Sequence, residues 1–81
     1  MRITFNRLIE DNEVVEVQKE FRNRFIETGV ENSHFTLGSH LGNSYQFTVN
    51  PEITQAQIEA VMDNSQGQKV IENIIMTEWS N

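Results

Sequence analysis

The stretch SYQFTVNPEITQAQI, residues 44–58, decides the fold of this chain. In its first half apolar residues alternate with polar ones, which is the two-residue period of a half-buried β-strand. The apolar positions are Tyr45, Phe47 and Val49. Because proline has no backbone N–H to donate to a strand ladder, Pro51 ends this strand.

The second half of the same stretch predicts the start of a helix. Thr54 and Gln57 have the spacing of a capping box, in which the Thr hydroxyl accepts from a backbone amide of the first turn and the Gln side chain reaches back. The polar stretch 63–67, which finishes on a glycine, is expected to end this helix. Its buried stripe would consist of Ile58, Val61 and Met62.

Two elements are predicted near the N-terminus. Ile3 and Phe5 alternate with polar residues, so we expect a first strand over roughly residues 2–8. A helix of about four turns should follow, since apolar residues recur there at spacings of three and four. Gly29 is placed to stop it. The apolar positions of this helix are Val14, Val17, Phe21 and Phe25.

A second strand is expected shortly before Ser44. Phe35 and Leu37 alternate with polar neighbours, which again is the period of a strand. Residues 38–43 contain two glycines and predict a long hairpin loop to the strand that begins near Ser44.

The tail from Val70 to Trp79 fits two structures. Its apolar residues would make one face of a helix, but the density of β-branched residues after Gly67 favours a strand. With a strand, the order is β-α-β-β-α-β, the ferredoxin-like α+β plan of a two-layer sandwich, in which two helices cover one face of a four-stranded antiparallel sheet. The alternative order is β-α-β-β-α-α.

Length and composition predict one small folded domain over residues 1–81. A chain of 81 residues with 37% hydrophobic residues has enough apolar material for a single core and no more. It contains no cysteine, which excludes disulfides, thiolate metal sites and thiol catalysis and favours a cytoplasmic location. No stretch is apolar enough to span a membrane.

The net charge of −6 is unevenly distributed along the chain. Residues 1–24 carry five basic and five acidic side chains, whereas residues 25–81 carry one lysine and seven acidic side chains. An acidic balance of this kind repels phosphate backbones and favours partners with basic surfaces. Nucleic acid is therefore an unfavoured partner.

The sequence contains no recognisable catalytic, cofactor or metal motif. Neither of the common phosphate-binding glycine patterns is present. His34 and His40 would need further ligands to hold a metal ion, and Ser39 lacks the strained turn of a nucleophilic serine. The prediction is a protein that is not an enzyme, with no cofactor and no bound metal.

Aromatic residues on the central strands leave one nucleic-acid alternative open. Phe5 on the first strand, and Tyr45 and Phe47 on the third, are placed similarly to the aromatic residues on which RNA-recognition motifs stack bases. This resemblance implies binding of RNA or single-stranded DNA. The other interpretation places the same side chains on the sheet face that packs under the two helices.

The leading functional hypothesis is a small acidic protein-binding module: a regulator, an inhibitor or an assembly subunit. One sharper version is a phage-type inhibitor that presents carboxylates to the nucleic-acid-binding groove of a host protein. A second hypothesis is a dimeric domain that senses a small ligand. Besides an open sheet edge, through which a homodimer could also form, the expected partner-binding residues are Glu52, Glu59, Asp63, Glu72, Glu78 and Trp79.

Overall fold

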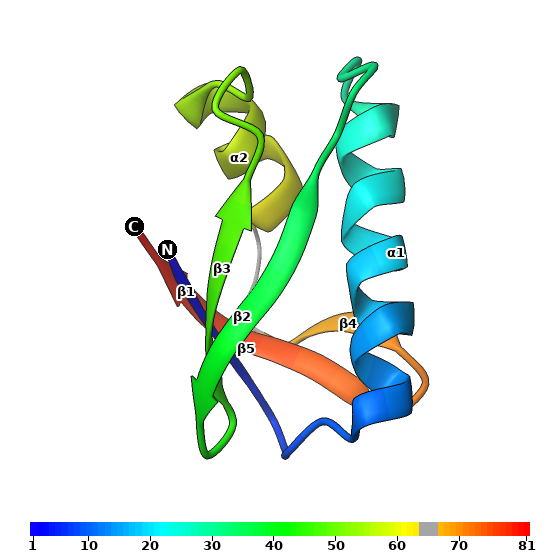
Figure 1. Ribbon diagram of the computed structural model, residues 1–81, viewed down its shortest axis with the longest axis vertical. Coiled ribbons are helices and arrows are strands. Elements are labelled where there is room, and N and C mark those ends of the chain that lie inside the picture. Colours follow the sequence, from blue (N-terminus) through cyan, green and yellow to red (C-terminus); the bar gives the residue numbers. More distant parts are fainter. Residues whose placement is uncertain (64–66) are drawn as a thin grey trace.

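The computed structural model describes residues 1–63 and 67–81. Residues 64–66, in the polar stretch expected to end the second helix, lie outside the described part. Figure 1 shows two helices packed beside a strongly twisted sheet. The elements in chain order are β1 (Arg2–Phe5), α1 (Asp11–Glu27), β2 (Phe35–Leu41), β3 (Ser44–Val49), α2 (Gln55–Met62), β4 (Gln68–Ile71) and β5 (Ile74–Ser80).

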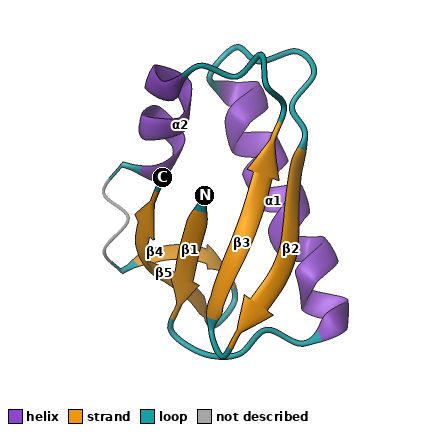
Figure 2. Ribbon diagram, turned by 60° about the vertical axis from the view of Figure 1, so that its left-hand side comes forward, coloured by secondary structure: helices purple, strands orange, loops and turns teal. Residues whose placement is uncertain are grey.

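All neighbouring strands are antiparallel, in the order β2-β3-β1-β5-β4. Both helices contribute side chains to the same core as the sheet, and the two termini lie side by side on the paired strands β1 and β5 (Figure 2). The predicted α+β class is confirmed. The order is compatible with the ferredoxin-like plan, to which β4 adds one strand at an edge.

The predicted number of four strands is wrong, because the tail forms two strands where one was expected. A turn at Glu72 and Asn73 divides it, and Glu72 takes a positive φ of 33° there. Since both halves keep their β-branched residues, β4 and β5 pair as a hairpin. The alternative in which the tail is helical is also wrong.

The hairpin between β2 and β3 also differs from the prediction. The loop is not the six residues 38–43 but the two-residue turn Gly42–Asn43, and β2 continues to Leu41. A bulge after Leu37 shifts the register, after which His40 lies opposite Tyr45 and pairing resumes. Gly42 has a φ of 62°, a conformation that favours glycine.

Strand β1 is shorter than predicted because the chain leaves the sheet at Asn6. The Asn6 side chain donates to the carbonyl oxygen of Asn73 (3.0 Å) and accepts from the amide of Ile75 (2.8 Å). It therefore ties the β1–α1 connection to the β4–β5 hairpin across more than 60 residues of sequence.

The helix boundaries agree with the sequence patterns. In α2 the Gln57 amide donates to the Thr54 hydroxyl (3.2 Å), and the Thr54 amide donates to the Gln57 side chain (2.9 Å). This is the predicted capping box. Gly29, two residues after α1, has a φ of 96°, which suits a residue that ends a helix. Within the described residues, neither helix has the length and apolar character needed to cross a membrane.

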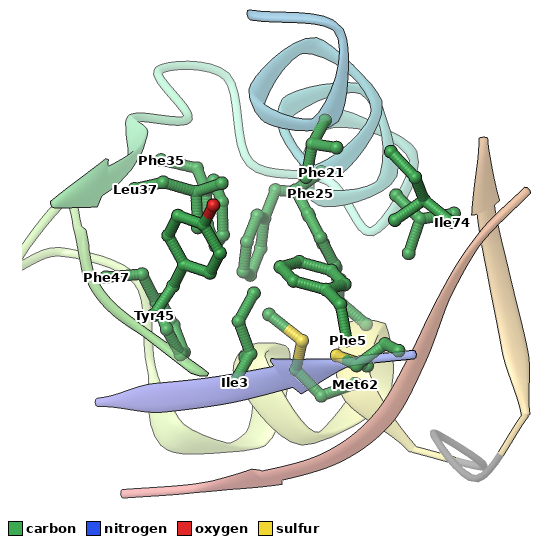
Figure 3. Packing of buried hydrophobic residues seen from close by; sticks show 14 of the residues in the cluster. Ile3, Phe5, Phe21, Phe25, Phe35, Leu37, Tyr45, Phe47, Met62 and Ile74 are labelled. Carbon is green, nitrogen blue, oxygen red and sulfur yellow. The ribbon is translucent and has the colours of Figure 1, made fainter. Parts of the chain in front are cut away.

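The core contains the aromatic residues of both layers (Figure 3). Phe35 of β2 stacks between Phe21 of α1 and Phe47 of β3, with ring centroids 4.6 and 5.1 Å away. Phe5 packs edge-on against Tyr45, whose hydroxyl donates to the carbonyl oxygen of Ile9 (3.2 Å). The period-two alternation therefore places these side chains on the helix-covered face.

An ion pair holds the start of α1. Arg7 makes two hydrogen bonds to the carboxylate of Glu13, at 2.9 and 2.8 Å. These bonds, together with the backbone amide of Glu10, lower the pKa of Glu13 to about 2 from an ordinary value of 4.5. The same pair raises the pKa of Arg7.

The lowered pKa of Glu13 predicts a pH-dependent contribution to stability. Because the carboxylate is favoured in the folded state, the pair stabilises the fold above pH 4.5, and this contribution is lost as the pH falls toward 2. Thermal unfolding of wild type and Glu13→Gln should therefore differ by a modest Tm shift at neutral pH, which shrinks across this window. A shift that is the same at both ends would contradict the assigned role of the pair.

Candidate functional site

The face of the sheet turned away from the helices is open and polar. Cross-strand partners share a face, so the pairs Arg2–Gln46 and Thr4–Ser44 lie on the side opposite buried Ile3. Arg2 donates to the Ser44 hydroxyl (3.1 Å). The side chains that the strand registers place here are all polar except Leu41: Arg2, Thr4, Thr36, Leu41, Ser44, Gln46, Thr48, Glu78 and Ser80.

This arrangement removes the basis of the RNA-binding alternative. Phe5, Tyr45 and Phe47 are at most 2% exposed, and all three belong to the core between the sheet and the helices. Base stacking needs aromatic rings on an accessible surface. The interpretation of these residues as core residues is confirmed.

The two edges of the sheet are β4 and β2, and β4 is protected. The Asn6 amide donates to the Ile75 carbonyl, and the Ile75 amide donates to the Asn6 side-chain oxygen, so the Ile75 backbone points toward β1. Its β4 partner Lys69 therefore turns its carbonyl toward the free edge. Arg24 of α1 donates to that carbonyl (2.7 Å). Strand β4 has only four residues and a register shift, which further limits pairing with another chain.

The edge along β2 is free. The Phe47 amide donates to Met1 on the β1 side, so the backbone of Leu37, opposite Phe47, points away from β3. Backbone N–H and C=O groups alternate sides along a strand, so those of Tyr45 point toward β1, as those of Phe47 do. The backbone of His40, opposite Tyr45, therefore also points away from β3. Within the described part of the chain, no backbone hydrogen bond reaches Leu37 or His40 from this side.

The outer half of β2 is also exposed at its side chains. Gly38, Ser39, His40 and Leu41 are all exposed, and Leu41, at 80%, is the most exposed large apolar residue. His40 stacks on Tyr45 with ring centroids 4.9 Å apart. A seven-residue strand with unpaired backbone groups and an exposed leucine is a template for β-strand addition. We call residues 35–41 with this outward backbone the β2 edge.

The acidic residues predicted to bind a partner are exposed, but they are spread over several elements. Glu52 lies in the turn before α2, Glu59 on α2 and Asp63 directly after it. Glu72 lies in the β4–β5 turn, which is hydrogen-bonded to Asn6 just after β1. The structure therefore does not bring the predicted residues together in one patch.

Glu78 and Trp79 point to opposite faces of the sheet. Glu78 lies opposite Thr4 on the open face, whereas Trp79 lies opposite buried Ile3. Trp79 is half-buried and packs against the core. Part of its apolar surface is thus used inside the domain.

The titratable side chains do not form a recognisable catalytic arrangement. His34 pairs with the Thr36 hydroxyl (2.9 Å), and His40 belongs to the β2 edge. Among residues 1–63 and 67–81 there is no group of three or more His, Cys, Asp or Glu side chains suited to a metal ion. The shifted pKa values belong to Arg7 and Glu13, whose pairing holds α1.

Comparison of the chain with protein-family models, with curated proteins and with solved structures gave no match. The sequence predicted an open sheet edge but not the length of the β2 edge, because Gly38 and Gly42 suggested a loop from residue 38 onward. The available signal was the Gly42-Asn43 dipeptide, since two such residues between strand-like runs are typical of a tight hairpin turn.

Proposed function

We propose that this protein is a non-enzymatic module that binds another protein by strand addition along the β2 edge. The observation that carries the proposal is the difference between the two sheet edges. Arg24 occupies the outward carbonyl of β4, whereas the outward backbone of β2 has no partner within the described residues. Natural sheets usually protect long edges, so an open edge of seven residues supports a role in pairing with another chain.

The charge of the protein indicates the chemistry of the partner. With a net charge of −6, and only Lys69 to offset seven acidic residues after position 24, the molecule attracts basic surfaces. Strand addition supplies the affinity, and the net negative charge of the molecule supplies the preference for a basic partner. A regulator or an inhibitor that occupies a surface of its partner fits this combination.

The inhibitor of a nucleic-acid-binding host protein is one version of this proposal. In that version Glu52, Glu59 and Asp63 take the place of backbone phosphates in a basic groove. Excess nucleic acid and high salt would then displace the protein from its partner. If neither changes the measured affinity, this version is wrong, while strand addition along β2 can still hold.

The β2 edge can be tested with a proline. In His40→Pro the outward N–H is lost, and a proline is tolerated on an edge strand where its nitrogen faces solvent. His40→Ala is the matched control, because it removes the same ring but keeps the amide. Capture from a lysate of the source cells should retain one partner with wild type and His40→Ala, and that partner should bind His40→Pro about tenfold or more weakly.

Several results would overturn the proposal. Equal binding by His40→Pro and His40→Ala would show that the β2 edge is not the contact, provided that circular dichroism shows both variants folded. Analytical sedimentation of the purified protein tests whether the β2 edge instead joins two copies of this chain. A dimer that dissociates in His40→Pro would identify the occupant of the edge as a second copy rather than a different protein.

A further inference from the structure

A cavity that opens widely to solvent lies between the two helices, on the side of the protected edge. Its volume is about 290 Å³, close to the lower limit of about 300 Å³ for pockets that hold small molecules. It therefore suits a molecule of a few heavy atoms. The lining residues are Arg24, Glu27 and Thr28 from the end of α1, Ala60 and Val61 from α2, and Gln68 from β4.

Two polar atoms of the lining residues lack a hydrogen-bond partner. They are Nη1 of Arg24 and Oε1 of Gln68, both buried, and among residues 1–63 and 67–81 neither has a partner. The rest of the guanidinium is fixed, since Nε donates to Glu20 (3.3 Å) and Nη2 to the Lys69 carbonyl (2.7 Å). The site thus offers one fixed donor and one acceptor that no other described protein group uses.

The charges around the cavity define the ligand. The guanidinium of Arg24 attracts a carboxylate, while the acceptor of Gln68 and the exposed carboxylate of Glu27 attract a positively charged donor. A simple anion would be repelled by the negative charge of Glu27, and a simple cation would be repelled by the positive charge of Arg24. A molecule that carries both charges satisfies both groups.

We propose that this cavity binds a free α-amino acid. Its carboxylate accepts from Arg24, its ammonium group donates to Gln68 and Glu27, and its side chain lies against Ala60 and Val61. Charge-assisted hydrogen bonds of this kind are the strong ones in ligand recognition. The small apolar wall favours small aliphatic side chains.

Both atoms are buried, so a ligand reaches them only after a lining side chain moves. We place this movement in the Gln68 amide, which carries one of the two atoms. The amide makes one hydrogen bond, from Nε2 to the Val61 carbonyl, and at 3.4 Å it is long. Rotation of the Gln68 amide therefore breaks only one weak hydrogen bond, and a hydrogen bond to the ligand replaces it.

The proposed site is independent of the β2 edge. Gln68 begins β4, and β4 and β2 are the two opposite edges of the sheet. An amino acid in the cavity and a protein chain on β2 would not compete for the same residues. Failure of one proposal leaves the other intact.

The experiment is a titration of the full chain with each of the standard L-amino acids, followed by thermal unfolding and by backbone amide NMR. A ligand that binds the folded state raises the Tm, and the expected amide shifts centre on residues 24, 27 and 68. L-alanine is compared with propanoate and ethylamine, which keep only its carboxylate or only its amine. Both are expected to bind much more weakly than the amino acid.

Two variants test the position of the site. Ala60→Phe fills the cavity and should abolish the shifts, whereas Ala56→Phe, at another exposed alanine of α2 that does not line the cavity, should leave them unchanged. Should Ala60→Phe fail to fold, Glu27→Gln removes an exposed charge and should weaken binding severalfold. Three results would overturn the inference: no response to any amino acid, equal binding by Ala60→Phe and Ala56→Phe, or propanoate that binds as well as L-alanine.

Discussion

Replacing Phe35 with alanine is expected to remove a large share of the stability of this protein. The ring is fully buried and stacks on Phe21 and Phe47, so it joins β2 to both α1 and β3. Loss of a buried phenylalanine destabilises proteins by about 3–5 kcal/mol, whereas a domain of this length has a total stability of roughly 4–12 kcal/mol. Urea unfolding followed by far-UV circular dichroism measures the change.

Phe35→Leu is the control for this experiment. Leucine keeps most of the apolar volume and loses mainly the stacking, so its unfolding midpoint should lie much closer to that of wild type. If Phe35→Ala unfolds at the wild-type urea concentration, β2 does not pack under α1 as described. The β2 edge would then also be misplaced.

Ile74→Ala is expected to have the second largest effect, and its neighbour provides the comparison. Ile74 is fully buried, whereas Ile75 is only half-buried, because adjacent residues of a strand point to opposite faces. Truncation of the buried isoleucine should lower the free energy of unfolding by about 2–5 kcal/mol. Ile75→Ala should lower it by clearly less.

This pair of variants also discriminates the two structures that the tail allowed. In a helix, Ile74 and Ile75 would both belong to the buried face, and the two truncations would be similarly severe. In the β4–β5 hairpin only Ile74 lies on the buried face. Equal destabilisation in urea unfolding would therefore contradict the fifth strand.

The candidate binding surface was only partly predictable. Exposure of the acidic residues followed from composition, and all five predicted carboxylates are indeed exposed. Their positions relative to one another did not follow, because Glu52 and Glu72 lie in separate turns, and long-range packing sets where those turns lie. The β2 edge was hidden for a local reason: a bulge keeps β2 in the sheet where its glycine suggested a loop.

By itself the sequence determined which side chains of an element share a face and where α2 begins, but not which face of the sheet packs under the helices. Alternation assigned Phe5, Tyr45 and Phe47 to one face, and Thr54 with Gln57 marked the start of α2, because these signals act over two to four residues. The tertiary structure alone decided the rest. That β4 is protected depends on Arg24 reaching Lys69, 45 positions away, and that β2 is open depends on the order of strands. Both follow from long-range packing, which no local pattern encodes.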